Sequence, residues 1–171
     1  DVVEIRAIAT SAIREAINAM DFTNEIFFKT TINPKVISGS EEADLIYNGV
    51  LWSHNFPERA VIMDIGGGST EFIFATEAGI EEKVSLNIGI SRIYQELKLE
   101  DPLTEKDVRK IEKWLDDRSN GFFKDKQCDV IVGASGTFET FHEMINHEHF
   151  SSNCQAQEMD MQAIASILDW V

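Results

Sequence analysis

The stretch AVIMDIGGGSTEFIFA, residues 60–75, decides the fold of this chain. Its first four residues are apolar, as in a short buried strand, and residues 72–75 are again apolar and prone to β-structure. Between the two runs stand Gly66, Gly67 and Gly68, so the pattern predicts a hairpin with a glycine-rich loop. Successive glycines can turn several backbone N–H groups toward one point, and Ser69 adds a hydroxyl donor. The stretch is therefore either a phosphate loop between two strands or a hairpin that merely turns.

Two commoner phosphate-binding loops do not fit this stretch. A P-loop needs Gly-Lys-Ser/Thr and a following helix, and neither is found here. A dinucleotide-binding turn needs a further glycine that opens a helix, and Glu71 stands where that glycine would be. The loop is thus of a different kind, one that joins two strands.

Two carboxylates flank the glycines. Asp64 ends the first strand, where its charge repels phosphate unless a cation lies between them. Mg²⁺ suits that position because it commonly binds one or two carboxylates together with phosphate oxygens. Glu71, just past the loop, can share the ion or hold a water molecule. The alternative is that Asp64 accepts hydrogen bonds from the loop's own N–H groups and binds nothing.

Composition narrows the class of protein. The chain has 171 residues, is 43% hydrophobic and has a net charge of −15, which argues against a nucleic-acid surface. No apolar run is long enough to span a membrane, and no signal peptide opens the sequence. Cys128 and Cys154 form neither a disulfide framework nor a metal motif. We therefore expect a cytoplasmic protein that binds neither nucleic acid nor membrane.

Arg14 is a candidate phosphate ligand. Thr10 or Ser11 can cap a helix that carries Ile13, Ile17 and Met20 at helical spacing, and Arg14 lies in its first turn. A cation at that end opposes the helix dipole unless an anion binds there. Arg14 is therefore either a phosphate clamp or an ordinary solvated arginine.

Glu42 is a candidate general base. Ser38 and Glu41 match a capping box for a helix that runs through Leu51, which accounts for Glu41. Glu42 instead shares a helical face with Ile46 and Val50, so we expect its carboxylate to point inward, where it could activate a water molecule. The alternative is a surface glutamate.

A second glycine loop follows another strand. Residues 129–132 are predicted to form a strand, and Gly133, Ser135 and Gly136 then lead into a helix. A strand–loop–helix turn points N–H groups at a phosphate. The spacing of His142, His147 and His149 matches no zinc motif, so we expect surface histidines.

Strands and helices alternate along the chain, which predicts an α/β architecture. The polar segment 53–57 is a plausible hinge between a unit at residues 1–52 and one at residues 58–171. Such a division would place Glu42 opposite the Gly66–Gly68 loop.

Four motifs carry a family resemblance: ATSAIREA at residues 9–16, ISGSEEADLIYNGV at 37–50, MDIGGGSTE at 63–71 and GASGT at 133–137. In this order they resemble the exopolyphosphatase/guanosine pentaphosphate phosphohydrolase (Ppx/GppA) family. The resemblance implies an actin-like, sugar-kinase-like (ribonuclease H-like) fold with two α/β lobes. Residues 1–52 would be the C-terminal part of lobe I, and residues 58–171 would be lobe II.

The resemblance also implies an activity, which is removal by water, with Mg²⁺, of the terminal phosphate of polyphosphate or the 5′ γ-phosphate of pppGpp. Glu42 matches the catalytic base, Glu71 a second catalytic acid, and Asp64 with Glu71 the metal-linked carboxylates. The phosphate-binding positions would be Arg14, Gly66, Gly67, Gly68, Ser69, Gly133, Ser135 and Gly136. Relatives often dimerise, so a homodimer is an expectation as well.

The sequence departs from the family at its ends. The family's N-terminal hairpin, with a phosphate loop of its own, has no counterpart here, and the chain begins without Met. We therefore expect a fragment that is inactive alone. Two rival interpretations remain: an ATP-dependent kinase or ATPase of the same superfamily, and a non-catalytic (p)ppGpp-binding sensor.

Overall fold

A four-stranded sheet forms the centre of the molecule. The computed structural model describes residues 2–56, 58–147 and 156–168. The sheet has the order β5-β4-β3-β6, formed by Gly79–Leu86, Thr70–Thr76, Ala60–Ile65 and Val130–Ala134 respectively. Neighbours β3, β4 and β5 are antiparallel, and β6 runs parallel to β3. Ile65 pairs with Thr70, so the predicted glycine-loop hairpin is confirmed.

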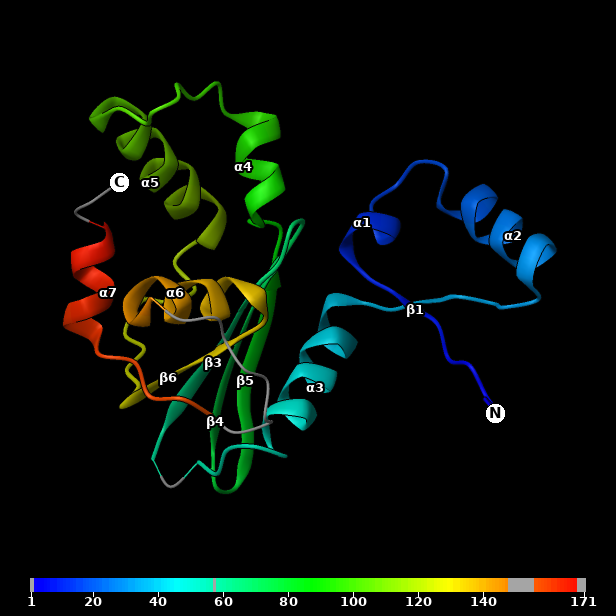
Figure 1. Cartoon of the computed structure of the whole chain (residues 1–171), viewed down its shortest axis with the longest axis horizontal. Coiled ribbons are helices and arrows are strands. Elements are labelled where there is room, and N and C mark those ends of the chain that lie inside the picture. The colour runs from blue at the N-terminus through cyan, green and yellow to red at the C-terminus, as the bar shows by residue number, and fades with distance from the viewer. Residues whose placement is uncertain (1, 57, 148–155, 169–171) are drawn as a thin grey trace.

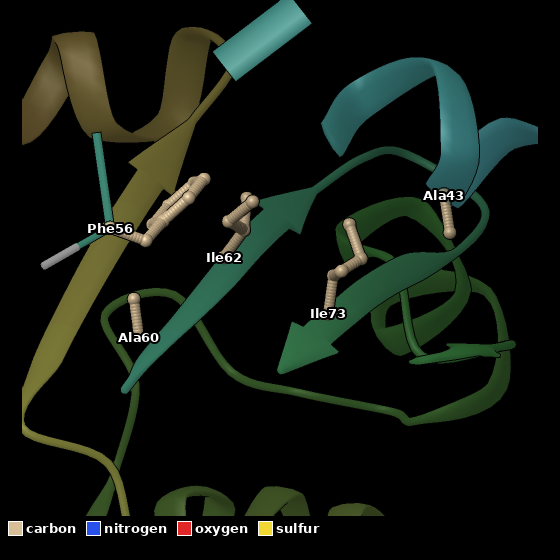
Figure 2. Packing of buried hydrophobic residues seen from close by; sticks show 5 residues of the cluster. All are labelled: Ala43, Phe56, Ala60, Ile62 and Ile73. Atoms are coloured by element: carbon tan, nitrogen blue, oxygen red, sulfur yellow. The ribbon is translucent and has the colours of Figure 1, made fainter. Parts of the chain in front are cut away.

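Strands β3 and β4 are apolar on both faces of the sheet because helices cover both. On one face, Ile62 and Ile73 pack with Ala43 of α3 (Gly39–Val50), as Figure 2 shows. On the other face, Phe72 and Phe74 pack with Trp114 of α5 (Glu105–Ser119). Alternate residues of a strand point to opposite faces. Asp64 and Glu71 therefore lie on the face that α3 covers, in step with Ile62 and Ile73.

Further helices complete the two layers around the sheet. Helix α4 (Ile90–Glu96) contributes Ile93 to the core on the α5 side. Helix α6 (Gly136–Asn146) follows β6 and contacts α7 (Met161–Leu168), beside which it lies in Figure 1. No helix in the described ranges is long and apolar enough to cross a membrane.

The N-terminal segment lies to one side of the sheet (Figure 1). It holds a two-stranded parallel sheet, β1 (Ile8–Ala9) with β2 (Lys35–Val36), and the helices α1 (Ser11–Arg14) and α2 (Ala19–Thr30). The single helix expected through Ile13, Ile17 and Met20 is wrong, because the chain leaves the helix after Arg14 and re-enters one at Ala19. Ile17 and Met20 are exposed, so no buried apolar face stabilises a continuous helix there.

Helix α3 begins with the predicted capping box, which is confirmed. The Ser38 hydroxyl accepts a hydrogen bond from the Glu41 N–H at 3.1 Å, and the Glu41 carboxylate accepts one from the Ser38 N–H at 2.9 Å. The apolar face of α3 packs on the four-stranded sheet, although the sequence division assigns this helix to the first unit. The division itself stays a prediction, and Pro57 of the expected hinge lies outside the described residues.

Candidate active site

The loop between β3 and β4 turns its carbonyl oxygens toward the start of α4. Three successive carbonyls each accept a hydrogen bond from this helix. The pairs are Gly66 O with the Ile90 N–H at 3.0 Å, Gly67 O with the Ser91 N–H at 2.8 Å, and Gly68 O with Arg92 Nε at 2.6 Å. The loop is thus docked on α4 through one side of its backbone.

The other side of the loop backbone presents N–H groups. In a trans peptide, the N–H of each residue points opposite to the preceding carbonyl. The amides of Gly67, Gly68 and Ser69 therefore point away from α4, and none of the three donates a hydrogen bond to another described residue. Unpaired amides that share one direction form an anion-binding site. The role of this loop in binding phosphate stays a prediction.

The glycines of this loop are needed for close approach. Gly66, Gly67 and Gly68 are not among the residues with a positive φ, so the left-handed conformation that glycine favours is not used. A Cβ on Gly68 would lie 2.4 Å from the Ser11 Oγ. Ser11 is only 5% exposed, and its hydroxyl has no hydrogen-bond partner among the described residues. The N-terminal segment thus touches the loop directly.

Asp64 and Glu71 face each other across the hairpin as cross-strand partners. Glu71 is 2% exposed and accepts a hydrogen bond from Ser85 Oγ at 2.6 Å. Burial raises the pKa of Glu71, while the hydroxyls of Ser85 and Ser69 oppose this shift and the charges of Glu42 and Asp64 add to it. Burial also raises the pKa of Asp64, against the effect of the Ser135 hydroxyl. When both are ionised, Asp64 and Glu71 therefore place two negative charges close together.

A buried carboxylate, Glu71, and a half-buried one, Asp64, lie next to unpaired amides, and this combination suits a divalent cation whose remaining ligands come from phosphate. Mg²⁺ usually binds one or two carboxylates and takes its other ligands from phosphate and water. No group of three or more His, Cys, Asp or Glu side chains within the described ranges could hold a metal. Within the described part of the chain, Asp64 and Glu71 are therefore available as ligands, but no complete set of protein ligands surrounds them. Of the three histidines that the sequence predicts to be at the surface, His149 lies outside the described residues.

Arg14 and Glu42 meet as an ion pair. Arg14 Nη1 donates to the Ile37 carbonyl at 3.0 Å and to Glu42 Oε2 at 3.1 Å. The two side chains are 18% and 17% exposed, so both point largely inward, as expected for Glu42. Glu41 faces solvent, and its hydrogen bonds from Lys35 and Ser38 lower its pKa to about 2. The neighbouring glutamates therefore differ in role, one capping the helix and one turned toward the sheet.

The first turn of α3 lies directly against β5. A Cβ on Gly39 would lie 2.4 Å from the Cβ of Ser85, the residue that donates to Glu71. A pocket of about 400 Å³ opens beside this contact, with Arg14, Lys83 and Ser85 in its wall. The structure therefore brings Glu42, Glu71 and Arg14 to one place from α3, β4 and α1.

The second glycine loop adjoins the first because β6 runs parallel to β3, with Ala134 opposite Asp64. Thr137 Oγ1 donates to the Ile65 carbonyl at 3.1 Å, which ties the two loops together. Ser135 adopts a φ of 71° at the start of α6, beside Asp64, and Gly136 is exposed. Gly133 lies under Phe138, whose ring a Cβ would meet at 2.2 Å, so its lack of a side chain serves packing.

Three residues of this site were missed by the sequence analysis: Glu15, Ser85 and Arg92. Glu15 lies between two arginines, 3.9 Å from Arg14 Nε and 3.7 Å from Arg92 Nη2. Arg92 stands in the first turn of α4, where a cation opposes the helix dipole, the same signal that singled out Arg14. Ser85 carries no comparable signal, because only the strand pairing shows that it faces Glu71.

Comparison with known proteins identifies the family of this chain. The model of the Ppx/GppA phosphatase family matches residues 1–168, so the chain belongs to that family. A curated relative, the bifunctional 3-dehydroquinate synthase/phosphatase of Fusobacterium nucleatum subsp. nucleatum, is 36% identical over 138 residues, which cover 77% of this chain and 21% of that protein.

Solved structures share the fold. An exopolyphosphatase from Cytophaga hutchinsonii has a TM-score of 0.91 at 28% identity, with 99% of this chain and 57% of that one covered. The Aquifex aeolicus member of the family has a TM-score of 0.78 at 28% identity, with 96% and 54% covered. The chain thus spans a little over half the length of these structures. The expected family and its actin-like, sugar-kinase-like α/β fold are confirmed.

Proposed function

We propose that this chain forms part of a phosphoanhydride hydrolase, which removes the terminal phosphate of polyphosphate, or the 5′ γ-phosphate of pppGpp, by attack of water. The observation that carries the proposal is the row of unpaired amides at Gly67, Gly68 and Ser69, which faces away from α4 next to the carboxylates of Asp64 and Glu71. Phosphoryl transfer depends on positioning and charge neutralisation more than on covalent chemistry by the protein. Family membership supports a phosphatase, and the choice of substrate is part of the proposal.

In this proposal the terminal phosphate binds to the amides of the first loop, and Ser135 with Gly136 contacts phosphate from the second. Arg14 uses the donors that do not hold Ile37 and Glu42 to bind a phosphate oxygen. Glu42, inward and next to that guanidinium, orients the attacking water and accepts its proton. Glu71, buried and close enough for its charge to interact with Glu42, supports the same water or the cation.

Asp64 and Glu71 would hold a Mg²⁺ ion, which would neutralise charge on the phosphate oxygens when bound. Without a cation, a chain with a net charge of −15 and two carboxylates beside the loop would repel its polyanionic substrate. Local donors and one ion can therefore reverse an unfavourable overall charge.

The test is phosphate release by the intact protein, supplied with polyphosphate or with pppGpp, in Mg²⁺ and in EDTA. We expect Mg²⁺-dependent release from at least one substrate. Asp64→Asn should abolish the response to Mg²⁺, whereas Asp44→Asn, a matched change at a residue that pairs with Lys83, should keep it.

Two outcomes would contradict the proposal. Tight pppGpp binding with no phosphate release from either substrate would favour a sensor. Consumption of ATP only with transfer to a second substrate would favour a kinase.

A further inference from the structure

We propose that Arg92 is a positioning residue of the phosphate loop, which fixes the Gly68–Ser69 peptide so that the Ser69 N–H faces the bound phosphate. The inference rests on the proposed function and adds to it a residue outside the row of amides. Arg92 would not touch the substrate, because it lies on the carbonyl side of the loop, behind the donors.

The third peptide of the loop differs from the first two in what holds it. The carbonyls of Gly66 and Gly67 are bound by backbone N–H groups of α4 at 3.0 and 2.8 Å. The Gly68 carbonyl has only a 3.4 Å contact from the Gly89 N–H, and its short bond, at 2.6 Å, comes from the Arg92 side chain. The Arg92 guanidinium therefore supplies the shorter of the two hydrogen bonds that orient the Ser69 amide.

Such a restraint is needed because the peptide follows a glycine. Gly68 has no Cβ to restrict rotation, so its peptide can turn over at little steric cost. A turned peptide would present a carbonyl oxygen, which repels phosphate, in place of a donor. The hydrogen bond from a cation also polarises the peptide and strengthens its N–H as a donor.

The guanidinium is itself held from the N-terminal segment. Its Nη2 lies 3.7 Å from Glu15 Oε2, and Glu15 Oε1 lies 3.9 Å from Arg14 Nε. Arg14 in turn binds Glu42 at 3.1 Å. A series of polar contacts thus runs from the loop carbonyl to the proposed base, with two hydrogen bonds at its ends and two longer ion-pair contacts at Glu15 between them.

The test follows the loop amides by ¹⁵N NMR while inorganic phosphate is added in the presence of Mg²⁺. In the unmodified protein, the amides of Gly67, Gly68 and Ser69 should all shift. In Arg92→Met the Ser69 response should be lost while that of Gly67 remains, and phosphate affinity should fall about tenfold, as for one lost charge-assisted hydrogen bond. Arg92→Lys, which keeps a donor, should restore part of the response.

Arg109→Met is the matched control, since it removes the same charge from an exposed site that pairs only with Glu105 among the described residues. It should leave every loop response unchanged.

A Ser69 response and a phosphate affinity in Arg92→Met equal to those of the unmodified protein would overturn this inference but not the proposed function. No response of any loop amide in the unmodified protein would overturn the phosphate loop as well. If Arg92→Met does not fold, Glu15→Gln should weaken the Ser69 response, and an unchanged response would again overturn the inference.

Discussion

Glu41 and Glu42 are adjacent in sequence, but Glu41 caps α3 at the surface and Glu42 points inward, which makes them a matched pair for a test at the scale of single residues. We expect Glu42→Gln to lower phosphate release by the intact protein at least about a hundredfold, because an amide cannot accept the proton of the attacking water. The Michaelis constant should change little, since the glutamine keeps the size of the side chain. Steady-state phosphate release measures both quantities.

Glu41→Gln is the control for this experiment. Glu41 binds Lys35 and the cap of α3, so Glu41→Gln should lower the free energy of unfolding only slightly, because glutamine keeps an acceptor for the cap, and leave turnover near normal. Equal activity of the two variants would remove Glu42 from the mechanism.

The burial of Glu71 predicts a dependence of stability on pH. Because its pKa is raised in the folded protein above the ordinary value of 4.5, the folded state holds the proton more tightly than the unfolded chain. The contribution of Glu71 to stability is therefore lost as the pH rises from that value through the folded-state pKa.

Glu71→Gln should thus raise the free energy of unfolding at neutral pH and change it little below pH 4.5. Denaturant titrations in EDTA at several pH values measure this difference. Asp64 contributes with the same sign and is present in both proteins. A variant that becomes less stable, relative to the unmodified protein, as the pH rises would show the sign to be wrong.

At this scale, the sequence predicted the features of single residues that depend on spacing within one helix. The capping box assigned Glu41 to the helix cap, and helical periodicity turned Glu42 inward, as the structure shows. Ser85 and Arg92 were not predicted, because their partners Glu71 and Gly68 lie 14 and 24 residues away and become neighbours only when β5 and α4 dock.

At the scale of elements, the contact between the loop and α4 determines the geometry of the proposed phosphate loop. A Cβ on Gly89 would lie 2.4 Å from the carbonyl carbon and oxygen of Gly67 and 2.5 Å from the Gly68 nitrogen. These are backbone atoms that cannot move without displacing the loop. We expect Gly89→Ala to weaken phosphate binding at least about tenfold, because the shifted amides lose their common direction.

Gly49→Ala is the matched change in a helix where no atom lies within 4 Å of the added methyl group. It should raise the free energy of unfolding by about 0.5–1 kcal/mol, from helix propensity alone, and leave binding unchanged. Phosphate titration calorimetry and thermal unfolding of both variants decide between the two effects. Normal phosphate affinity in Gly89→Ala would show that the loop does not depend on this contact.

The elements themselves were predictable where burial and periodicity agree. Residues 60–63 of β3 and 72–75 of β4 form continuous apolar runs because both faces of these strands are covered, and the two runs predicted the hairpin. The helix expected near residues 10–20 failed for the converse reason. Its apolar residues are spaced as in a helix, but Ile17 and Met20 are exposed in the structure. The helical spacing therefore does not correspond to a buried face.

At the scale of the whole molecule, the N-terminal segment and the sheet meet at the candidate site. The contacts are Gly39 against Ser85, Ser11 against Gly68, and Glu15 between two arginines. None of these could be predicted from one sequence, because each joins parts of the chain that no local pattern relates. The sequence motifs predicted which residues share a function, and the fold shows how they reach one another.

The most direct measurement is phosphate release by the intact protein in water enriched in ¹⁸O, with polyphosphate or pppGpp and Mg²⁺. The account predicts one ¹⁸O atom in each phosphate that leaves and none in the shortened product, because water attacks the terminal phosphorus. Label in the shortened product, or phosphate that leaves without label, would contradict it.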